Sequence, residues 1–238
     1  SLFADLSDSV DFGESATYTT FGQWVRASLS LTATVPRTYM DFNIRRNGVA
    51  PTNGDGFTFY VCCADLEAGS FPTSYDPTTS AALTRTADSG IISGAAFTAF
   101  YNQAGGSAVV QFDLIAVSGT RPIISFDDNT ANERIELYAS GTDLRMRVVD
   151  GGATQADMSI GTVAANTTYK AAIAWAANDS AGCLHGGTVA TDSSGTLPTP
   201  DRLRIGSDQA GNFQCGHEKT LRVFAQRIPN ATLQGMTA

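Results

Sequence analysis

Two Cys-x-His pairs carry side chains of the types that bind zinc. The chain's two histidines each follow a cysteine by two positions, in Cys-Leu-His at 183–185 and Cys-Gly-His at 215–217. Residues two apart share one face of a β-strand, so two neighbouring strands could present four ligands of the kind that tetrahedral zinc prefers. Zinc-ligand pairs more often have the spacing Cys-x₂₋₄-Cys. The pattern therefore leaves three alternatives open: zinc binding, a disulfide between Cys183 and Cys215, or two unpaired cysteines.

A second set of residues has the oxygen chemistry that calcium prefers. Asp127, Asp128 and Asn129 form a carboxylate-rich turn, and Asn132 and Asp150 could add further ligands. Asp and Asn also favour turns for conformational reasons alone. The sequence therefore predicts either a calcium site made of Asp127, Asp128, Asn129 and Asp150, or an ordinary solvated turn with no cofactor.

Aromatic and hydrogen-bonding side chains in loops indicate a site for a sugar. An aromatic platform flanked by Asn, Asp and Arg groups suits a ring that carries hydroxyls. Phe213 follows Gly211 and Asn212 in a turn-like segment, and an aromatic residue in a loop is a functional hint. The predicted ligand-binding residues are Tyr101, Asp128, Asn132, Arg134, Asn212 and Phe213.

Catalytic constellations are not recognisable in the chain. Neither histidine lies in a nucleophile-elbow motif, and no string Glu-x-Asp-x-x-Glu places glycosidase carboxylates on one strand face. Glu133 and Glu136 are three apart, so a strand would send them to opposite faces. We therefore expect that the protein is not an enzyme.

The composition is that of a globular β-protein. Of 238 residues, 42% are hydrophobic and only 16% are charged, and the net charge is −8. Nucleic-acid binding needs clustered Lys and Arg, and Arg45–Arg46 is the nearest approach to such a run, so no nucleic-acid partner is expected. No apolar stretch approaches the roughly 20 residues of a membrane helix, so no membrane insertion is expected.

Period-two alternation of apolar and polar residues predicts strands over most of the chain. Trp24 and Trp175 lie in such strands and are predicted core residues. Val109–Ile115 and Pro122–Phe126 are expected to pair, and Arg134–Tyr138 with Leu144–Val149 to form a hairpin. The other predicted strands are Arg26–Val35, Met40–Ile44, Phe57–Val61, Tyr169–Trp175, Cys183–Leu184, Arg202–Ile205 and Thr220–Phe224. A helix is predicted only at Pro229–Met236, capped by Asn230.

Strand spacings of about 8–12 residues are typical of an antiparallel sandwich. The expected organisation is a partial β-module at 1–66, a Pro-, Gly- and Ser-containing linker at 67–89, and a larger sandwich at 90–238. Because the chain begins at Ser1 without Met, we expect that it is processed or belongs to a longer protein.

Two passages of the sequence carry a recognisable pattern. The run ADLEAGSFPTSYDPT at 64–78 is similar to the end of carbohydrate-binding-module-like jelly rolls in bacteriophage structural proteins. The runs IISFDDNTANERI at 123–135, LRMRVVDGGATQAD at 144–157 and GTVAANTTY at 161–169 resemble a recurrent phage pattern of the concanavalin A or laminin-G type. The resemblance implies an all-β fold, an antiparallel jelly-roll sandwich of the concanavalin A-like type with a second, smaller β-module.

The same resemblance implies a function in the virion. The expected role is a lectin-like, receptor-binding tail or head fibre or spike that binds host-surface glycans without catalysis. Such attachment proteins are usually homotrimers, because multivalency compensates for weak single sites. The alternatives are a structural decoration or adaptor protein that contacts other virion proteins, and a polysaccharide depolymerase.

Overall fold

A computed structural model describes residues 2–5, 15–16, 41–44, 75, 77 and 88–238. The chain divides into two compact units, Ser1–Arg85 and Thr86–Ala238. In the first unit, the described strands form one antiparallel sheet of order β2-β1-β3, with β1 at Leu2–Asp5, β2 at Ser15–Ala16 and β3 at Asp41–Ile44. Strand β3 falls within the predicted strand at 40–44.

Several predictions for the first 89 residues lie outside the described part of the chain. These are the strands at 26–35 and 57–61, the core position of Trp24, and the linker at 67–89 except for residues 75, 77, 88 and 89. The second unit, described from residue 88 onward, is called here the C-terminal unit.

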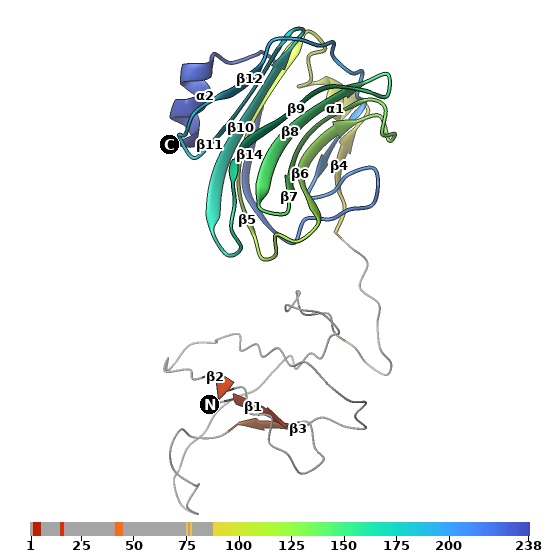
Figure 1. The fold of residues 1–238 in the computed structure, drawn as a ribbon. Coiled ribbons are helices and arrows are strands. Elements are labelled where there is room, and N and C mark those ends of the chain that lie inside the picture. The colour runs from red at the N-terminus through yellow and green to blue at the C-terminus, as the bar shows by residue number, and fades with distance from the viewer. Residues whose placement is uncertain (1, 6–14, 17–40, 45–74, 76, 78–87) are drawn as a thin grey trace, which may run out of the picture. The chain divides into compact units, whose positions relative to one another are not determined.

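The C-terminal unit is a sandwich of two antiparallel sheets (Figure 1). The six-stranded sheet has the order β4-β13-β6-β7-β8-β9 and the five-stranded sheet the order β12-β11-β10-β5-β14. The strands of the six-stranded sheet are β4 (Gly90–Ser93), β6 (Thr120–Asp127), β7 (Arg134–Ser140), β8 (Asp143–Asp150), β9 (Ala153–Thr162) and β13 (Arg202–Ile205). Those of the five-stranded sheet are β5 (Gly105–Leu114), β10 (Thr168–Ala176), β11 (Asp179–Leu184), β12 (Ala190–Asp192) and β14 (Gly216–Phe224). The predicted antiparallel sandwich is confirmed.

The core lies between the two sheets and follows the period-two alternation of the strands. Trp175 is only 1% exposed, as predicted, and its ring lies 4.9 Å from that of Phe126 in the opposite sheet. Large side chains of this kind supply most of the apolar area that stabilises a sandwich. The core therefore fixes which face of each strand is left for solvent and ligands.

The connection between β5 and β6 differs from the prediction. These strands follow one another in sequence but lie in different sheets, so the expected pairing of 109–115 with 122–126 is wrong. Alternation indicates that both strands have a buried face, and it does not say which sheet each strand joins. The hairpin of β7 and β8 is confirmed, with Gly141 at φ 60° in the turn.

Two short helices complete the unit, α1 (Ala95–Thr98) and α2 (Asn230–Thr237). Helix α2 confirms the prediction near the C-terminus, although Pro229 occupies the N-cap position and no side chain caps the helix, so the expected cap by Asn230 is wrong. Helix α1 was not predicted, because four residues are too few to show helical periodicity. Neither described helix is long and apolar enough to cross a membrane.

Candidate functional site

The outer face of the six-stranded sheet gathers charged side chains from five strands. In β8, Leu144 and Met146 are fully buried in the core, so the intervening Arg145 and the following Arg147 point outward. The same alternation applies to the neighbouring strands. We call the outward charged residues the charged face: Asp127, Arg134, Glu136, Asp143, Arg145, Arg147, Asp157, Arg202 and Arg204.

The register of the strands aligns these side chains into rows. One row runs across β13, β6, β7, β8 and β9 as Arg204, Ser125, Glu136, Arg147 and Asp157. A second row contains Arg202, Asp127 and Arg134. Directly opposed residues lie about 5 Å apart, so opposite charges on adjacent strands are within reach of one another.

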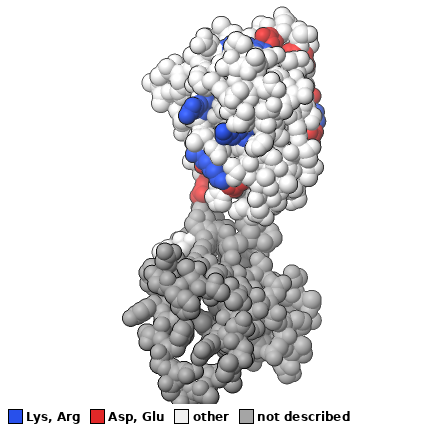
Figure 2. All heavy atoms as spheres, turned by 90° about the vertical axis from the view of Figure 1, so that its left-hand side faces the viewer, with Lys and Arg blue, Asp and Glu red and all other residues white. Residues whose placement is uncertain are grey.

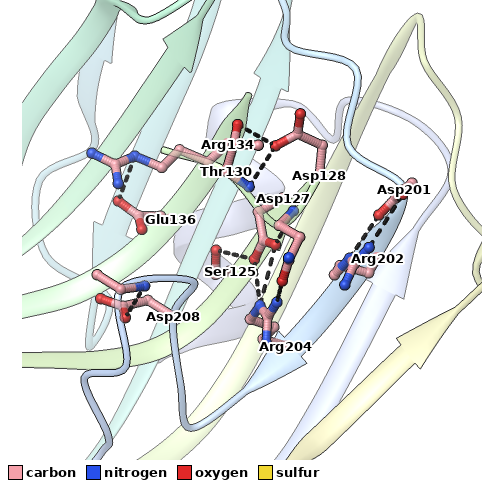
Figure 3. A network of polar contacts seen from close by, with 12 residues as sticks. Ser125, Asp127, Asp128, Thr130, Arg134, Glu136, Asp201, Arg202, Arg204 and Asp208 are labelled. Carbon is pink, nitrogen blue, oxygen red and sulfur yellow. Dashed lines mark hydrogen bonds and ion pairs between the residues drawn. The ribbon is translucent and has the colours of Figure 1, made fainter. Parts of the chain in front are cut away.

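A buried ion pair lies at the β6–β13 side of the charged face (Figure 3). Arg204 Nε donates to both Asp127 oxygens at 3.0 and 3.2 Å, and the Asp127 side chain is 0% exposed. Ser125 Oγ and the Asn129 backbone amide also donate to the carboxylate, each at 2.9 Å. The Asp127 carboxylate is therefore fully occupied by protein donors, as a buried charge requires.

A more exposed network lies on β8 and β9. Arg145 Nε and Arg147 Nη2 reach the Asp157 carboxylate at 2.9 and 3.1 Å. Arg147 also donates to the Tyr138 hydroxyl and lies 4.6 Å from the centre of that ring. A hydrogen bond from Ser159, together with Arg145, holds the pKa of Asp143 below its usual range. These pairs orient the guanidinium groups while leaving their edges in solvent.

Glu136 lies between these two networks and is only 5% exposed. Its Oε2 is 3.3 Å from Arg134 Nε. Burial raises the pKa of this carboxyl to about 7, Arg134 and Arg147 act to lower it, and Asp208 and Asp127 act to raise it. Glu136 is therefore a carboxyl that exchanges its proton near neutral pH.

The loop at 206–215 approaches the charged face with Asp208. This carboxylate is 8% exposed and accepts hydrogen bonds from the Asn212 backbone and side-chain amides at 2.9 and 2.7 Å. Asn212, a predicted ligand-binding residue, is thus held within its own loop. Phe213 is 41% exposed, and its carbonyl accepts a 3.4 Å hydrogen bond from Arg121. Phe213 remains free to meet a ligand.

Three of the other predicted sugar ligands lie in or directly after one turn. Arg134 is on the charged face, whereas Asp128 and Asn132 belong to the turn between β6 and β7. Asp128 Oδ1 accepts hydrogen bonds from the Thr130 backbone and hydroxyl at 2.8 and 2.6 Å, and so closes its own turn. Phe213 belongs to a different segment, the loop at 206–215 between β13 and β14.

Tyr101 lines a cavity of about 540 Å³ beside α1, together with Thr98, Gln103 and Arg202. Its ring stacks on Phe97 with the centroids 4.7 Å apart, and burial raises the pKa of its hydroxyl well above the usual range. Tyr101 is therefore mainly a packing residue, with part of its surface in the cavity.

The predicted calcium ligands are not assembled. Asp127 and Asn129 both bond to Arg204, and Asp150 accepts a hydrogen bond from the Thr196 hydroxyl. In the part of the chain that the structure describes, no three His, Cys, Asp or Glu side chains are grouped to hold a metal ion. The guanidinium of Arg204, and not a metal ion, balances the charge of Asp127.

The zinc and disulfide alternatives for the cysteines are also not formed. Strands β11 and β14 are separated by two strands in the five-stranded sheet, which keeps the two Cys-x-His segments apart. Cys183 and Cys215 are both free and buried. The third alternative, two unpaired cysteines, is the one that the structure confirms.

Most of the charged face was missed by sequence reasoning. The alternation in Leu-Arg-Met-Arg-Val at 144–148 could have indicated that Arg145 and Arg147 share an outward face. Asp157 was missed because β9 was not predicted. The Asp127–Arg204 pair spans 77 positions of sequence, and no local pattern indicates it.

Comparisons with known proteins find similarity in structure but no match in sequence. No protein-family model matches the chain, and no curated protein matches it. The carbohydrate-binding module CBM40 of the Ruminococcus gnavus IT-sialidase, bound to α2,3-sialyllactose, is similar in structure with a TM-score of 0.50 and 14% identity, over 57% of this chain and 83% of that chain. The same module bound to α2,6-sialyllactose has a TM-score of 0.50 and 13% identity, over 58% of this chain and 85% of that chain.

A third structure is the NanB sialidase of Streptococcus pneumoniae in complex with 2-[(3-chlorobenzyl)ammonio]ethanesulfonate. It has a TM-score of 0.50 and 9% identity, over 57% of this chain and 24% of the sialidase. At such identities the likeness shows the fold alone. That fold is the predicted jelly-roll β-sandwich.

Proposed function

We propose that the C-terminal unit binds a carbohydrate on the charged face, without converting it. The observation that carries this proposal is the alternation of guanidinium and carboxyl groups around Tyr138 on one strand-borne surface. Sugar hydroxyls both donate and accept hydrogen bonds, so a surface that offers both partners side by side suits them. Rigid strands hold these groups more precisely than loops would.

An acidic sugar fits this surface better than a neutral one. Arg134 and Arg147 keep terminal N–H donors that no described residue accepts, and guanidinium groups bind carboxylates strongly and often through two hydrogen bonds. The similar sialidase module binds sialyllactose, a glycan with a carboxylate. This likeness supports the choice of ligand class.

The wider role that we propose is attachment of a virion to host-surface glycans, as part of a homotrimeric tail or head fibre or spike. It rests on the resemblance of 64–78 and 123–169 to phage virion proteins. Incubation of the protein with intact bacterial cells, before and after periodate oxidation of their glycans, tests this role. Loss of binding on oxidation is expected, and retention of full binding would contradict it.

Glycan binding itself is tested on the full chain by an array of neutral and acidic glycans, followed by calorimetry with 3′-sialyllactose. Arg134→Ala should weaken binding at least about tenfold, because a charge-assisted hydrogen bond contributes about 1.5–3 kcal/mol. The matched control is Arg222→Ala, an exposed arginine on β14 in the other sheet. Equal losses in both variants, or no glycan bound by the wild type, would refute the proposal.

A further inference from the structure

Glu136 has an unusual position for a carboxyl group on a solvent-facing sheet surface. Its register partners are Ser125 on β6 and Arg147 on β8. Arg134 Nε, on its own strand, lies 3.3 Å away. Among the described residues, no hydrogen bond reaches the Glu136 carboxyl, whereas the Asp127 carboxylate in the neighbouring row accepts four.

The charges that face Glu136 come from each element packed around it. Arg147 on β8 and Arg134 on β7 favour the ionised form, and Asp127 on β6 and Asp208 in the loop at 206–215 oppose it. Asp127 is itself neutralised by Arg204. Burial is the largest influence and favours the neutral carboxyl, which explains a pKa of about 7.

Two charge states of the charged face follow from this arrangement. The face carries five arginines and the carboxyls of Asp127, Asp143, Asp157 and Glu136. With Glu136 ionised the arginines exceed the carboxylates by one, and with Glu136 protonated they exceed them by two. The negative charge that protonation removes lies beside Arg134 and Arg147, both of which keep unused N–H donors.

We propose that Glu136 is the positioning residue that decides whether the charged face accepts an anionic glycan. In its protonated form it leaves Arg134 and Arg147 available to the carboxylate of the ligand. In its ionised form it competes with that carboxylate for the same guanidinium groups. This inference rests on the proposed function and specifies the ligand as an acidic sugar whose binding is coupled to protonation.

The coupling must be reciprocal. If a proton on Glu136 strengthens ligand binding, then the bound anion must raise the affinity of Glu136 for that proton. Ligand binding near and above the pKa therefore transfers a fraction of a proton, at most one, from solvent to the Glu136 carboxylate, and the only covalent bond formed is this O–H. A purely structural role for Glu136 would produce no such uptake.

The experiment is calorimetry of the full chain with 3′-sialyllactose at pH 6.0, 7.5 and 8.5, in pairs of buffers that differ in ionisation enthalpy. We expect the wild-type affinity to fall about tenfold from the lowest to the highest pH. Uptake of roughly half a proton is expected near pH 7.5, where free and bound forms differ most in protonation. Neutral lactose should show no such pH dependence.

The variant Glu136→Gln keeps the size and shape of the side chain but cannot ionise, so it tests the effect of protonation alone. We expect this variant to bind several-fold more tightly than the wild type at pH 8.5 and to lose proton uptake. The matched control is Glu218→Gln, which removes another buried carboxyl with a raised pKa, in the five-stranded sheet. The control should retain both the wild-type pH profile and the proton uptake.

The outcomes distinguish this inference from the proposed function. Binding without proton uptake, or an unchanged pH profile in Glu136→Gln, would overturn the role of Glu136 and leave glycan binding intact. Loss of binding at every pH in a folded Glu136→Gln variant would also overturn it, because the carboxylate would then contact the ligand directly. No binding by the wild type at any pH would overturn both.

Discussion

The two outer faces of the sandwich contrast in what covers them. On the five-stranded sheet, the outward residues Ala172, Ala174 and Ala181 are fully buried because α2 packs on them through Leu233. Small side chains let the helix backbone approach the sheet closely. Figure 2 shows the side of the unit that carries α2, where uncharged side chains predominate.

On the six-stranded sheet the outward positions are occupied by the charged face instead. Helix α2 contacts β5, β10 and β11 of the other sheet, and α1 lies beside the edge strand β4 with Phe97 in the core, so neither described helix packs on the charged side chains of β6 to β9. A face of this kind needs internal charge pairs to remain folded and unused donors to bind a ligand. The outer face of the five-stranded sheet is therefore covered by a helix and contributes to the stability of the fold. The outer face of the six-stranded sheet stays accessible to a ligand.

The largest expected effect concerns the ion pair that supports the charged face. Asp127→Ala removes the partner of Arg204 and leaves a largely buried guanidinium without a counter-charge. We expect the free energy of unfolding to fall by about 3–5 kcal/mol, measured by urea denaturation. Asp201→Ala is the control, because its pair with Arg202 is solvent-exposed and contributes less than about 1 kcal/mol. Similar losses in both variants would mean that burial does not distinguish these pairs.

The second prediction concerns the outer face of the five-stranded sheet, which α2 covers. Leu233→Ala removes a fully buried side chain between α2 and the alanines, and should cost about 3 kcal/mol of stability. Glycan affinity of the folded protein should not change, because α2 is on the other sheet. Thr232→Ala, an exposed position in the same helix, is the control and should be near neutral. A loss of affinity in the folded Leu233→Ala variant would show that the two faces are coupled.

The contrast between the faces was only partly predictable from sequence. Alternation located β7, β8, β10, β13 and β14, since each has a clear apolar side facing the core. Strand β9 was missed although Ala156, Met158 and Ile160 alternate with polar residues, because alanine and the preceding Gly151-Gly152 weaken the hydrophobic contrast. Which strands share a sheet was not predictable, as β5 and β6 show.

The candidate site was less predictable than the fold. A carboxylate-rich turn indicates a cation, and the sequence does not say whether that cation is a metal or an arginine from another strand. Arg204 reaches Asp127 only because β13 pairs with β6. Likewise, burial among several strands is what mainly raises the pKa of Glu136, and Asp208, which adds to the shift, approaches from a distant loop. Arg134 was predicted as a ligand-binding residue because it follows the carboxylate-rich turn that begins at Asp127.

The third prediction compares the pH response of the two sheets. Burial, and then Asp113, raise the pKa of Glu218 on β14 to about 8, against a usual value of 4.5. A raised pKa in the folded state means that its stabilising contribution is complete below about pH 4.5 and is lost as pH rises through 8. Glu218→Gln should therefore flatten the fall in unfolding free energy between pH 5 and 9 by on the order of 2 kcal/mol.

Glu136 should contribute to the same fall, but at lower pH, since its pKa is about 7. The double variant Glu136→Gln, Glu218→Gln should therefore show the flattest profile of all, measured by urea denaturation across this range. A stability that rises with pH in the wild type would contradict both assignments, because the buried carboxyls would then be stabilised as anions.

The smallest expected effect tests how far the ligand surface extends beyond the strands. Phe213→Ala should change the free energy of unfolding by less than about 0.5 kcal/mol, because an exposed side chain gains little from folding. If the glycan reaches the loop at 206–215, loss of this ring should weaken binding several-fold, since an aromatic contact contributes about 0.5–1.5 kcal/mol. We expect that weakening, because Asp208 brings the same loop to Glu136. Unchanged affinity would confine the ligand to the strand-borne part of the charged face, and Arg134 would then be the only sequence-predicted residue that contacts it.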